Sequence, residues 1–140
     1  GNEPSHHVTH LYNYVNRPWR TQELVDSVFQ SQYANRPDGL AGNEDCGQMS
    51  AWYILNSMGF YQVCPGKPVY SIGRPVFDQA VVNLTNGKKF TVMVKNNSKK
   101  NKYIESMLLN GQTLHPPFFS HQDIVDGGTL KITMSDKPNK

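Results

Sequence analysis

The sequence is poor in cysteine and has no long apolar run. Its 140 residues include only two cysteines, Cys46 and Cys64, which are too few for a disulfide framework. We expect two small thiols in the core, with a Cys46–Cys64 bridge as the alternative. No apolar stretch approaches the roughly 20 residues that span a bilayer, and no signal peptide is visible, so we expect no membrane span.

Charge and catalytic signatures are also sparse. The net charge of +3 is mild, and much of it lies in residues 95–102, for which we predict a solvated hairpin loop, and in the C-terminal tail. A nucleic-acid surface needs basic residues on one face together with stacking aromatics. None is evident, so we expect no nucleic-acid partner. The chain also has no Ser/His/Asp signature, phosphate-binding loop or dinucleotide fingerprint.

The composition changes character near Pro65. Residues 1–64 carry helical periodicity, whereas residues 66–140 alternate apolar and polar side chains between turn signals. We therefore predict an α+β protein, with a helical segment over residues 1–64 and a small antiparallel, sandwich-like β domain over residues 65–140.

The first two predicted helices are short and amphipathic. Ser5 caps the first, and proline at position 18 ends it, because proline disfavours helix in the residue before it. Thr21 caps the second. The buried faces are predicted from the spacing of apolar residues: Val8, Leu11, Tyr12 and Val15 in the first helix, and Leu24, Val25, Val28 and Phe29 in the second.

A third helix is predicted from Asp45 or Cys46 to Met58, with Gly59 as its stop. Apolar side chains surround its axis, which indicates a helix buried among others. The sequence also begins inside a motif without an initiator methionine. We therefore expect this chain to be a fragment of a longer protein with further helices.

Turn dipeptides divide the second half into strands. Asn86-Gly87 lies between two alternating runs, which is a strong hairpin signal, and Asn110-Gly111 is a second. Residues 120–123 resemble a capping box that opens a short helical turn. A last alternating strand is expected over residues 130–134.

Residues 42–53 carry the most informative pattern, with Glu44 and Asp45 in a glycine-flanked loop before the third helix. One interpretation is helix capping, because Asp at an N-cap and Glu near it stabilise a helix. The other is chemistry: a general base for water, or a ligand for a hard cation. Flanking glycines allow a ligand to approach the backbone closely.

Residues 1–7, Gly-Asn-Glu-Pro-Ser-His-His, have the same character. Adjacent histidines point about 100° apart on a helix, so His6 and His7 cannot ligate one zinc ion as an i, i+4 pair could. Asn2 and Glu3 supply hard oxygen ligands, which suit calcium better. His6 and His7 then bind a polar substrate or are satisfied by neighbouring groups.

The two tryptophans have different expectations. Aromatic faces stack on sugar rings, but a tryptophan in a buried helix is more commonly part of a core. We predict that Trp52 is a core residue, and Trp19 remains a candidate for sugar binding.

Both acidic motifs, in this order, resemble the C-terminal part of the calcium-dependent exo-acting α-mannosidases of glycoside hydrolase family 92. The similarity continues through further stretches over essentially the whole chain: residues 11–14, 38–53, 59–66 and 70–75. The resemblance implies the closing helices of an (α/α)6 barrel followed by a terminal β layer. It also implies inverting hydrolysis of terminal α-mannosides of glycans, with α-1,2 linkages as the expected type, and a calcium ion that holds mannose hydroxyls.

The resemblance also implies roles for individual residues. Asp45 is the expected general base, and Glu44 and Asn43 support it or bind sugar. Position 43 holds an amide where a carboxylate could share the base role. Asn2 and Glu3 fall at the calcium-side motif, so at least one of them is expected to ligate. A third group of expected sugar contacts comprises His6, His7 and Trp19.

The family's general acid is expected upstream of Gly1, in the remainder of the full-length enzyme. We therefore expect the isolated chain to be inactive. The resemblance further implies a periplasmic or secreted bacterial enzyme. Two other classes stay open: a calcium-dependent carbohydrate-binding module without hydrolysis, and a purely structural C-terminal domain.

Overall fold

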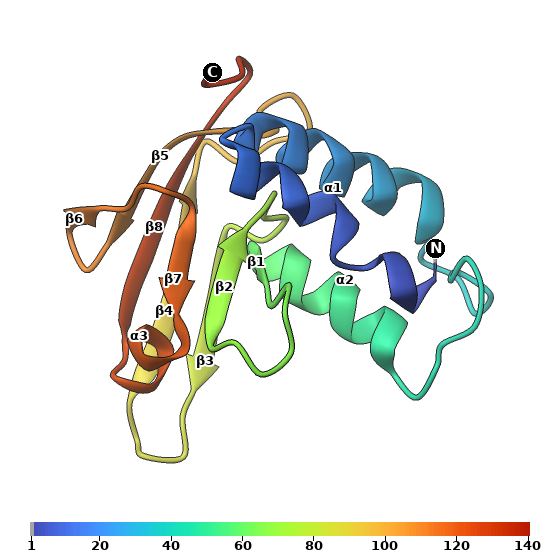
Figure 1. Ribbon diagram of the computed structural model, residues 1–140, viewed down its shortest axis with the longest axis horizontal. Coiled ribbons are helices and arrows are strands. Elements are labelled where there is room, and N and C mark those ends of the chain that lie inside the picture. Colours follow the sequence, from blue (N-terminus) through green and yellow to red (C-terminus); the bar gives the residue numbers. More distant parts are fainter. Residues whose placement is uncertain (1) are drawn as a thin grey trace.

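The computed structural model describes residues 2–140 and has helices on one side and two small sheets on the other (Figure 1). The helical half comprises two 3-10 helices and two α-helices: η1 (Glu3–Ser5), η2 (Val8–Val15), α1 (Pro18–Gln32) and α2 (Gln48–Met58). One short helix, α3 (His121–Val125), lies between the last strands.

The strands form a three-stranded sheet and a five-stranded sheet. The smaller has the order β1-β2-β7, from β1 (Phe60–Tyr61), β2 (Val69–Ile72) and β7 (Phe118–Ser120). The larger has the order β3-β4-β8-β5-β6, from β3 (Gln79–Asn83), β4 (Lys89–Lys95), β8 (Gly128–Ser135), β5 (Tyr103–Leu109) and β6 (Gln112–Thr113). The α+β class and the sandwich-like layering are therefore confirmed.

Both predicted hairpins and the capping box are present. β3 and β4 pair antiparallel across Asn86-Gly87, and β5 and β6 pair antiparallel across Asn110-Gly111. Asn110 and Gly111 both have positive φ, as such a tight turn requires. At the start of α3, the Ser120 hydroxyl accepts from the backbone N–H of Asp123, whose side chain accepts from the backbone N–H of Ser120.

The prediction of a wholly antiparallel second half is wrong in one place. β4 and β8 pair in parallel, from Phe90↔Gly128 to Lys95↔Thr133. β8 therefore lies between β4 and β5, and residues 96–102 cross the end of β8 instead of closing a hairpin. These residues are mostly exposed, as expected of a basic loop. Alternation alone cannot report the direction of a partner that is distant in sequence.

The first helix is also different from the prediction. Residues 8–15 form a 3-10 helix. Because this helix has three residues per turn, the residues at i, i+3, i+4 and i+7 do not lie on one face of it. His10 and Asn13, three positions apart, are the buried residues, while the side chains of Val8, Leu11 and Val15 are 43–63% exposed. Ser5 ends η1 and caps nothing.

The starts of α1 and α2 are shifted from their predicted positions. α1 begins at Pro18, whose fixed φ suits the first helical position, so Thr21 is a fully buried residue inside the helix and not its cap. α2 begins at Gln48, two to three residues later than expected, and ends at Gly59 with φ of 104° as predicted.

Two hydrophobic clusters hold the molecule together. The larger lies between the two sheets, where Phe90 of β4 stacks on Phe119 of β7 with ring centroids 5.7 Å apart. The smaller lies between α1, α2 and β1 and contains Val25, Phe29 and Trp52, the last only 2% exposed, which confirms Trp52 as a core residue. The proposed domain boundary near residue 64 stays a prediction. β1 lies before this boundary and pairs with β2, which lies after it.

The cysteines do not form core thiols. Cys46 and Cys64 are both free and exposed, in loops before α2 and after β1. Cys46 has φ of 58° in a tight turn, which points its side chain out of the packed layers. Neither the core expectation nor the alternative bridge holds in this structure.

A buried polar network joins η2 to the rest of the fold. His10 is fully buried; its Nε2 lies 2.8 Å from Oδ1 of Asn56 and its Nδ1 lies 3.0 Å from Oγ of Ser71. Asn56 donates to the backbone oxygen of Trp52, so its Oδ1 is an acceptor and His10 Nε2 carries the proton. A Cβ at Gly73 would lie 3.0 Å from the His10 ring, so the backbone there has room only for glycine.

We expect the neutral state of His10 to make the fold sensitive to acid. Burial lowers the pKa of His10 from 6.5 to about 4, and its neighbours Ser71, Asn56 and Tyr61 are uncharged. Since the unfolded chain binds the proton first, the free energy of unfolding falls as the pH drops from 6.5 towards 4, by up to ~1.4 kcal/mol per pH unit. Urea unfolding of the chain at pH 7, 5.5 and 4.5 measures this slope.

The pH dependence of the free energy of unfolding is due to His10 only if substitution of His10 removes it. His10→Gln should be less stable at pH 7 but flatter between pH 6.5 and 4. The exposed His121→Gln variant is the matched control and should keep the wild-type slope. An unchanged slope in His10→Gln would assign the acid sensitivity to other groups.

Candidate acidic site at the start of α2

The loop that precedes α2 has an unusual backbone. Positive φ values occur at Gly42, Asp45, Cys46 and Gly47, which are 100°, 49°, 58° and 89° respectively. Such values are costly for residues with a Cβ and are held by surrounding contacts. The contacts here are hydrogen bonds to the first turn of α2.

Glu44, and not Asp45, caps α2 with its side chain. Its Oε1 accepts from the backbone N–H of Ser50 at 3.0 Å, and its Oε2 accepts from the Ser50 hydroxyl at 3.0 Å. The backbone oxygens of Asp45 and Glu44 accept from the N–H groups of Gln48 and Met49, both at 3.2 Å. The loop thus satisfies the free N–H groups of the helix and leaves the Asp45 carboxylate unused by capping.

The Asp45 carboxyl meets the Glu3 carboxyl, so the two acidic motifs come together. A hydrogen bond to Asp45, which needs a proton on one of the two groups, raises the pKa of Glu3, and the negative charge of Asp45 adds to this. Asp45 itself is exposed to solvent. A carboxyl whose pKa is raised in this way is one whose charged form a bound cation would stabilise.

Glu3 has an oxygen with no partner. Its Oε2 is enclosed and accepts no hydrogen bond from a described residue. Calcium takes six to eight oxygen ligands, many from carboxylates and amides. Glu3, with the exposed amide of Asn2 beside it, fits part of such a shell. Within residues 2–140, no three His, Cys, Asp or Glu side chains gather as a metal site.

The two histidines differ in surroundings. His6 is 8% exposed and His7 is exposed. Nε2 of Gln48 lies 3.2 Å from Nδ1 of His6, and Sδ of Met49 lies 3.2 Å from its Nε2. The backbone oxygen of His6 accepts from Nε1 of Trp52 at 2.9 Å. Burial lowers the pKa of His6, which favours a neutral ring.

A hollow of about 290 Å³ lies beside this group. Asn2 and His6 line it, together with Tyr33, Met49 and Trp52. His7 and Asn43 are exposed near the two motifs and do not line it. The structure thus brings Asn2, Glu3 and His6 to the loop that carries Asn43, Glu44 and Asp45.

Trp19 lies elsewhere. It is at the first turn of α1, whereas the acidic loop follows the other end of that helix. A helix of 15 residues is about 20 Å long, and this length separates its two ends. It lines a separate hollow with Ile104, His115 and other residues of the β half. Sugar binding by Trp19 therefore stays a prediction, without a place beside the acidic site.

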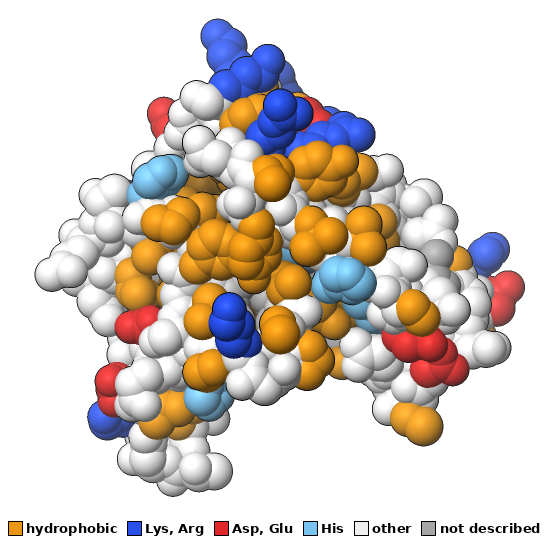
Figure 2. All heavy atoms as spheres, in the orientation of Figure 1, with side chains coloured by type: hydrophobic (Ala, Val, Ile, Leu, Met, Phe, Trp, Pro, Cys, Tyr) orange, Lys and Arg blue, Asp and Glu red, His pale blue; other side chains and the backbone are white. Residues whose placement is uncertain are grey.

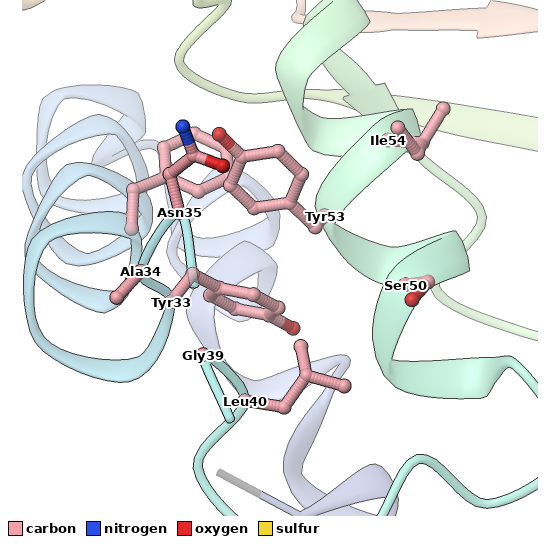
Figure 3. Close-up of a pocket in the computed structure, with 9 residues that line it drawn as sticks. Tyr33, Ala34, Asn35, Gly39, Leu40, Ser50, Tyr53 and Ile54 are labelled. Carbon is pink, nitrogen blue, oxygen red and sulfur yellow. The ribbon is translucent and has the colours of Figure 1, made fainter. Parts of the chain in front are cut away.

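A cavity of about 500 Å³ lies between the end of α1, the following loop and α2 (Figure 3). Tyr53, Ser50 and Ile54 line it along α2, and Asn35 and Leu40 face them from the loop. It contains no carboxylate or imidazole side chain. Of the site residues, it approaches only Glu44, through the Ser50 hydroxyl.

Basic side chains are most concentrated at one end of the molecule. Lys and Arg side chains gather at the end of the molecule where the C-terminus lies, while hydrophobic side chains cover the middle of the same face (Figure 2). Lys100, in the loop after β4, pairs with Asp136 after β8 at 3.2 Å. No described helix is long and apolar enough to cross a bilayer.

The sequence did not single out Gln48, Met49 and Tyr61 as neighbours of the site. Gln48 bridges His6 and the hydroxyl of Tyr61, with distances of 3.2 and 3.1 Å. No local pattern reports such a contact, because it joins three segments that are far apart in sequence. The only signal was position, since Gln48 directly follows the acidic loop.

Comparisons with known proteins match this chain to one enzyme family. The model of the glycosyl hydrolase family 92 catalytic domain matches residues 1–136. A protein of Arthroderma benhamiae named "uncharacterized secreted glycosidase" is 33% identical over 96% of this chain. The chain spans 18% of the length of that relative.

Solved structures of the same family are also similar to this chain. The family GH92 alpha-mannosidase BT3965 of Bacteroides thetaiotaomicron, in complex with mannoimidazole, has a TM-score of 0.94 and 44% identity over 99% of this chain and 18% of its own. The family GH92 inverting mannosidase BT2199 of the same organism has a TM-score of 0.91 and 40% identity over 99% of this chain and 19% of its own. The chain therefore belongs to glycosyl hydrolase family 92.

Proposed function

We propose that the full-length protein carrying this chain is an exo-acting, inverting, calcium-dependent α-mannosidase that removes terminal mannose from glycans. The observation that carries the proposal is the meeting of Glu3 and Asp45, which come from two motifs far apart in sequence. Two related structures, a mannosidase in complex with mannoimidazole and an inverting mannosidase, support the substrate class and the stereochemistry.

Asp45 is proposed as the general base. Its carboxylate is exposed, is not used in capping, and lies at the end of α2 where the helix dipole favours negative charge. In an inverting hydrolysis the base takes a proton from a water molecule that attacks the anomeric carbon, and it lies ~6.5–9.5 Å from the general acid. Glu44 holds this base in place through Ser50.

Asn2 and Glu3 are proposed as calcium ligands. The enclosed, unpartnered Oε2 of Glu3 is the donor that most requires a cation. A bound calcium would supply positive charge for the 2- and 3-hydroxyls of mannose. Asn43 and His7 are exposed enough to contact the sugar directly, whereas both ring nitrogens of His6 already have partners.

The general acid is proposed to lie outside this chain, so the chain alone should not turn over substrate. Export to the periplasm or to the medium is also proposed, supported by the secreted relative. The α-1,2 linkage is our proposal for the preferred bond.

Proton NMR tests the proposed function. An α-1,2-mannobioside is incubated with the full-length protein and with the isolated chain, each with calcium and with a chelator. Only the full-length protein with calcium should release mannose, and β-mannose should form first. Initial release of α-mannose would exclude inversion. Full activity in chelator would exclude calcium, and robust turnover by the isolated chain would refute an external acid.

A further inference from the structure

Of residues 2–7, the segment that carries Glu3, only His6 is hydrogen-bonded to α2 among the described residues. The backbone hydrogen bonds of this segment are local, from the N–H of Ser5 to Asn2 and from the N–H of His6 to Glu3, at 3.0 and 3.1 Å. The carboxyls of Glu3 and Asp45 repel each other when both are charged. Something else must hold this segment against the acidic loop.

His6 is the attachment point. Three groups of α2 contact it: the Gln48 amide, the Met49 sulfur and the Trp52 indole N–H. The Met49 sulfur is a weak acceptor, and Trp52 donates to the backbone oxygen of His6, while its ring lies 5.7 Å from the His6 ring without a hydrogen bond to it. The Gln48 amide is therefore the strong partner of the His6 ring.

Gln48 is also tied to the other motif. Its backbone N–H donates to the backbone oxygen of Asp45 at 3.2 Å, and its side-chain Nε2 lies 3.1 Å from the Tyr61 hydroxyl. An amide nitrogen only donates, so Nδ1 of His6 is the acceptor and the ring proton is on Nε2. One residue thus contacts the Asp45 backbone on one side and the Glu3-bearing segment on the other.

We propose that Gln48 is a positioning residue that fixes the calcium-side segment, residues 2–7, relative to the base Asp45. The proposal rests on the proposed function. Gln48 touches neither sugar nor metal in this assignment; it sets the separation of the groups that do. Removal of a residue that orients metal ligands without contacting the metal typically lowers metal affinity or activity ~10- to 100-fold.

Gln48→Leu in the full-length protein tests the proposal. The leucine keeps similar bulk and good helix propensity but removes both side-chain hydrogen bonds. Turnover of an α-mannoside should fall ~10- to 100-fold, and the calcium concentration for half-maximal activity should rise by a similar factor. The rise in melting temperature that calcium produces, which does not depend on turnover, should shrink in parallel.

Gln62→Leu is the matched control. Gln62 is also partly exposed, and its amide donates to the Lys67 backbone oxygen at 3.0 Å, away from His6. Its turnover and calcium requirement should equal those of the wild type. A merely structural role for Gln48 would lower the melting temperature and leave the calcium requirement within twofold of the wild-type value, and that result overturns the proposal.

Gln48→Glu covers the case in which the leucine variant fails to fold. An acidic residue in the first turn suits the helix dipole, yet its carboxylate cannot donate to His6. It should show the same loss of turnover and the same weaker calcium response; wild-type values would overturn the proposal. A wild-type protein that cleaves no mannoside would instead refute the proposed function and, with it, this role.

Discussion

Asp45→Asn should lower the turnover of the full-length protein by ~100- to 10,000-fold and leave substrate affinity nearly unchanged. The amide has the same shape but cannot take a proton from water, and general-base catalysis is worth ~100- to 10,000-fold. The backbone oxygen that holds Gln48 is retained, so the loop should keep its conformation. Measurements of kcat and of the dissociation constant of a mannose-like inhibitor separate the two effects.

Asp38→Asn is the matched control for this variant. Asp38 is an exposed aspartate in the same connection between α1 and α2, where it pairs with Arg36 at 3.3 Å. An exposed ion pair of this kind contributes little, so both kcat and affinity should equal those of the wild type. If Asp45→Asn kept wild-type turnover, Asp45 would not be the base.

The same variant separates the enzyme from a binding module. A calcium-dependent binding module has no base to lose, so its sugar affinity would survive in Asp45→Asn and no hydrolysis would exist in the wild type. A purely structural domain would show neither sugar affinity nor a calcium response.

Local signals account for what the sequence predicted of the fold. The Asn-Gly hairpins, the capping box at Ser120 and the glycine stop of α2 each depend on residues within a few positions of one another. Their geometry is set by backbone sterics and short hydrogen bonds, so a single sequence reports them.

Two of the wrong predictions depended on distant partners. The parallel pairing of β4 with β8 is decided by residues nearly forty positions apart. Residues 8–15 turn a polar face inward because Ser71 and Asn56 offer buried hydrogen-bond partners there. Apolar periodicity could not register either interaction.

For the candidate site, the sequence predicted which residue types would be present but not which of them would cap α2. Asp45 was the candidate both for the cap and for the base, and the hydrogen bonds of Glu44 to Ser50 show that Glu44 makes the cap. The contact of Asp45 with Glu3 and the bridge through Gln48 both depend on how α2 packs against residues 2–7.

Trp52→Ala should lower the free energy of unfolding by about 3–5 kcal/mol, as buried tryptophan truncations do. The side chain is 2% exposed and lies parallel to the Tyr33 ring at 5.8 Å, with Phe29 packed edge-on at the same centroid distance. Removal leaves a cavity between α1 and α2 and an unpaired backbone oxygen at His6. Urea unfolding of the chain at pH 7 measures the loss.

Two further variants separate packing from the hydrogen bond. Trp52→Phe keeps a ring but removes the indole N–H, so it should cost an intermediate amount, with about 1 kcal/mol from the lost bond to His6. Trp19→Ala truncates a half-exposed tryptophan at the other end of α1 and should cost far less than Trp52→Ala. Equal losses for Trp19→Ala and Trp52→Ala would mean that the small cluster around Trp52 is not what joins the two helices. The N-terminal segment with Glu3 would then have to be held mainly from the side of β2, through His10 and Asn13.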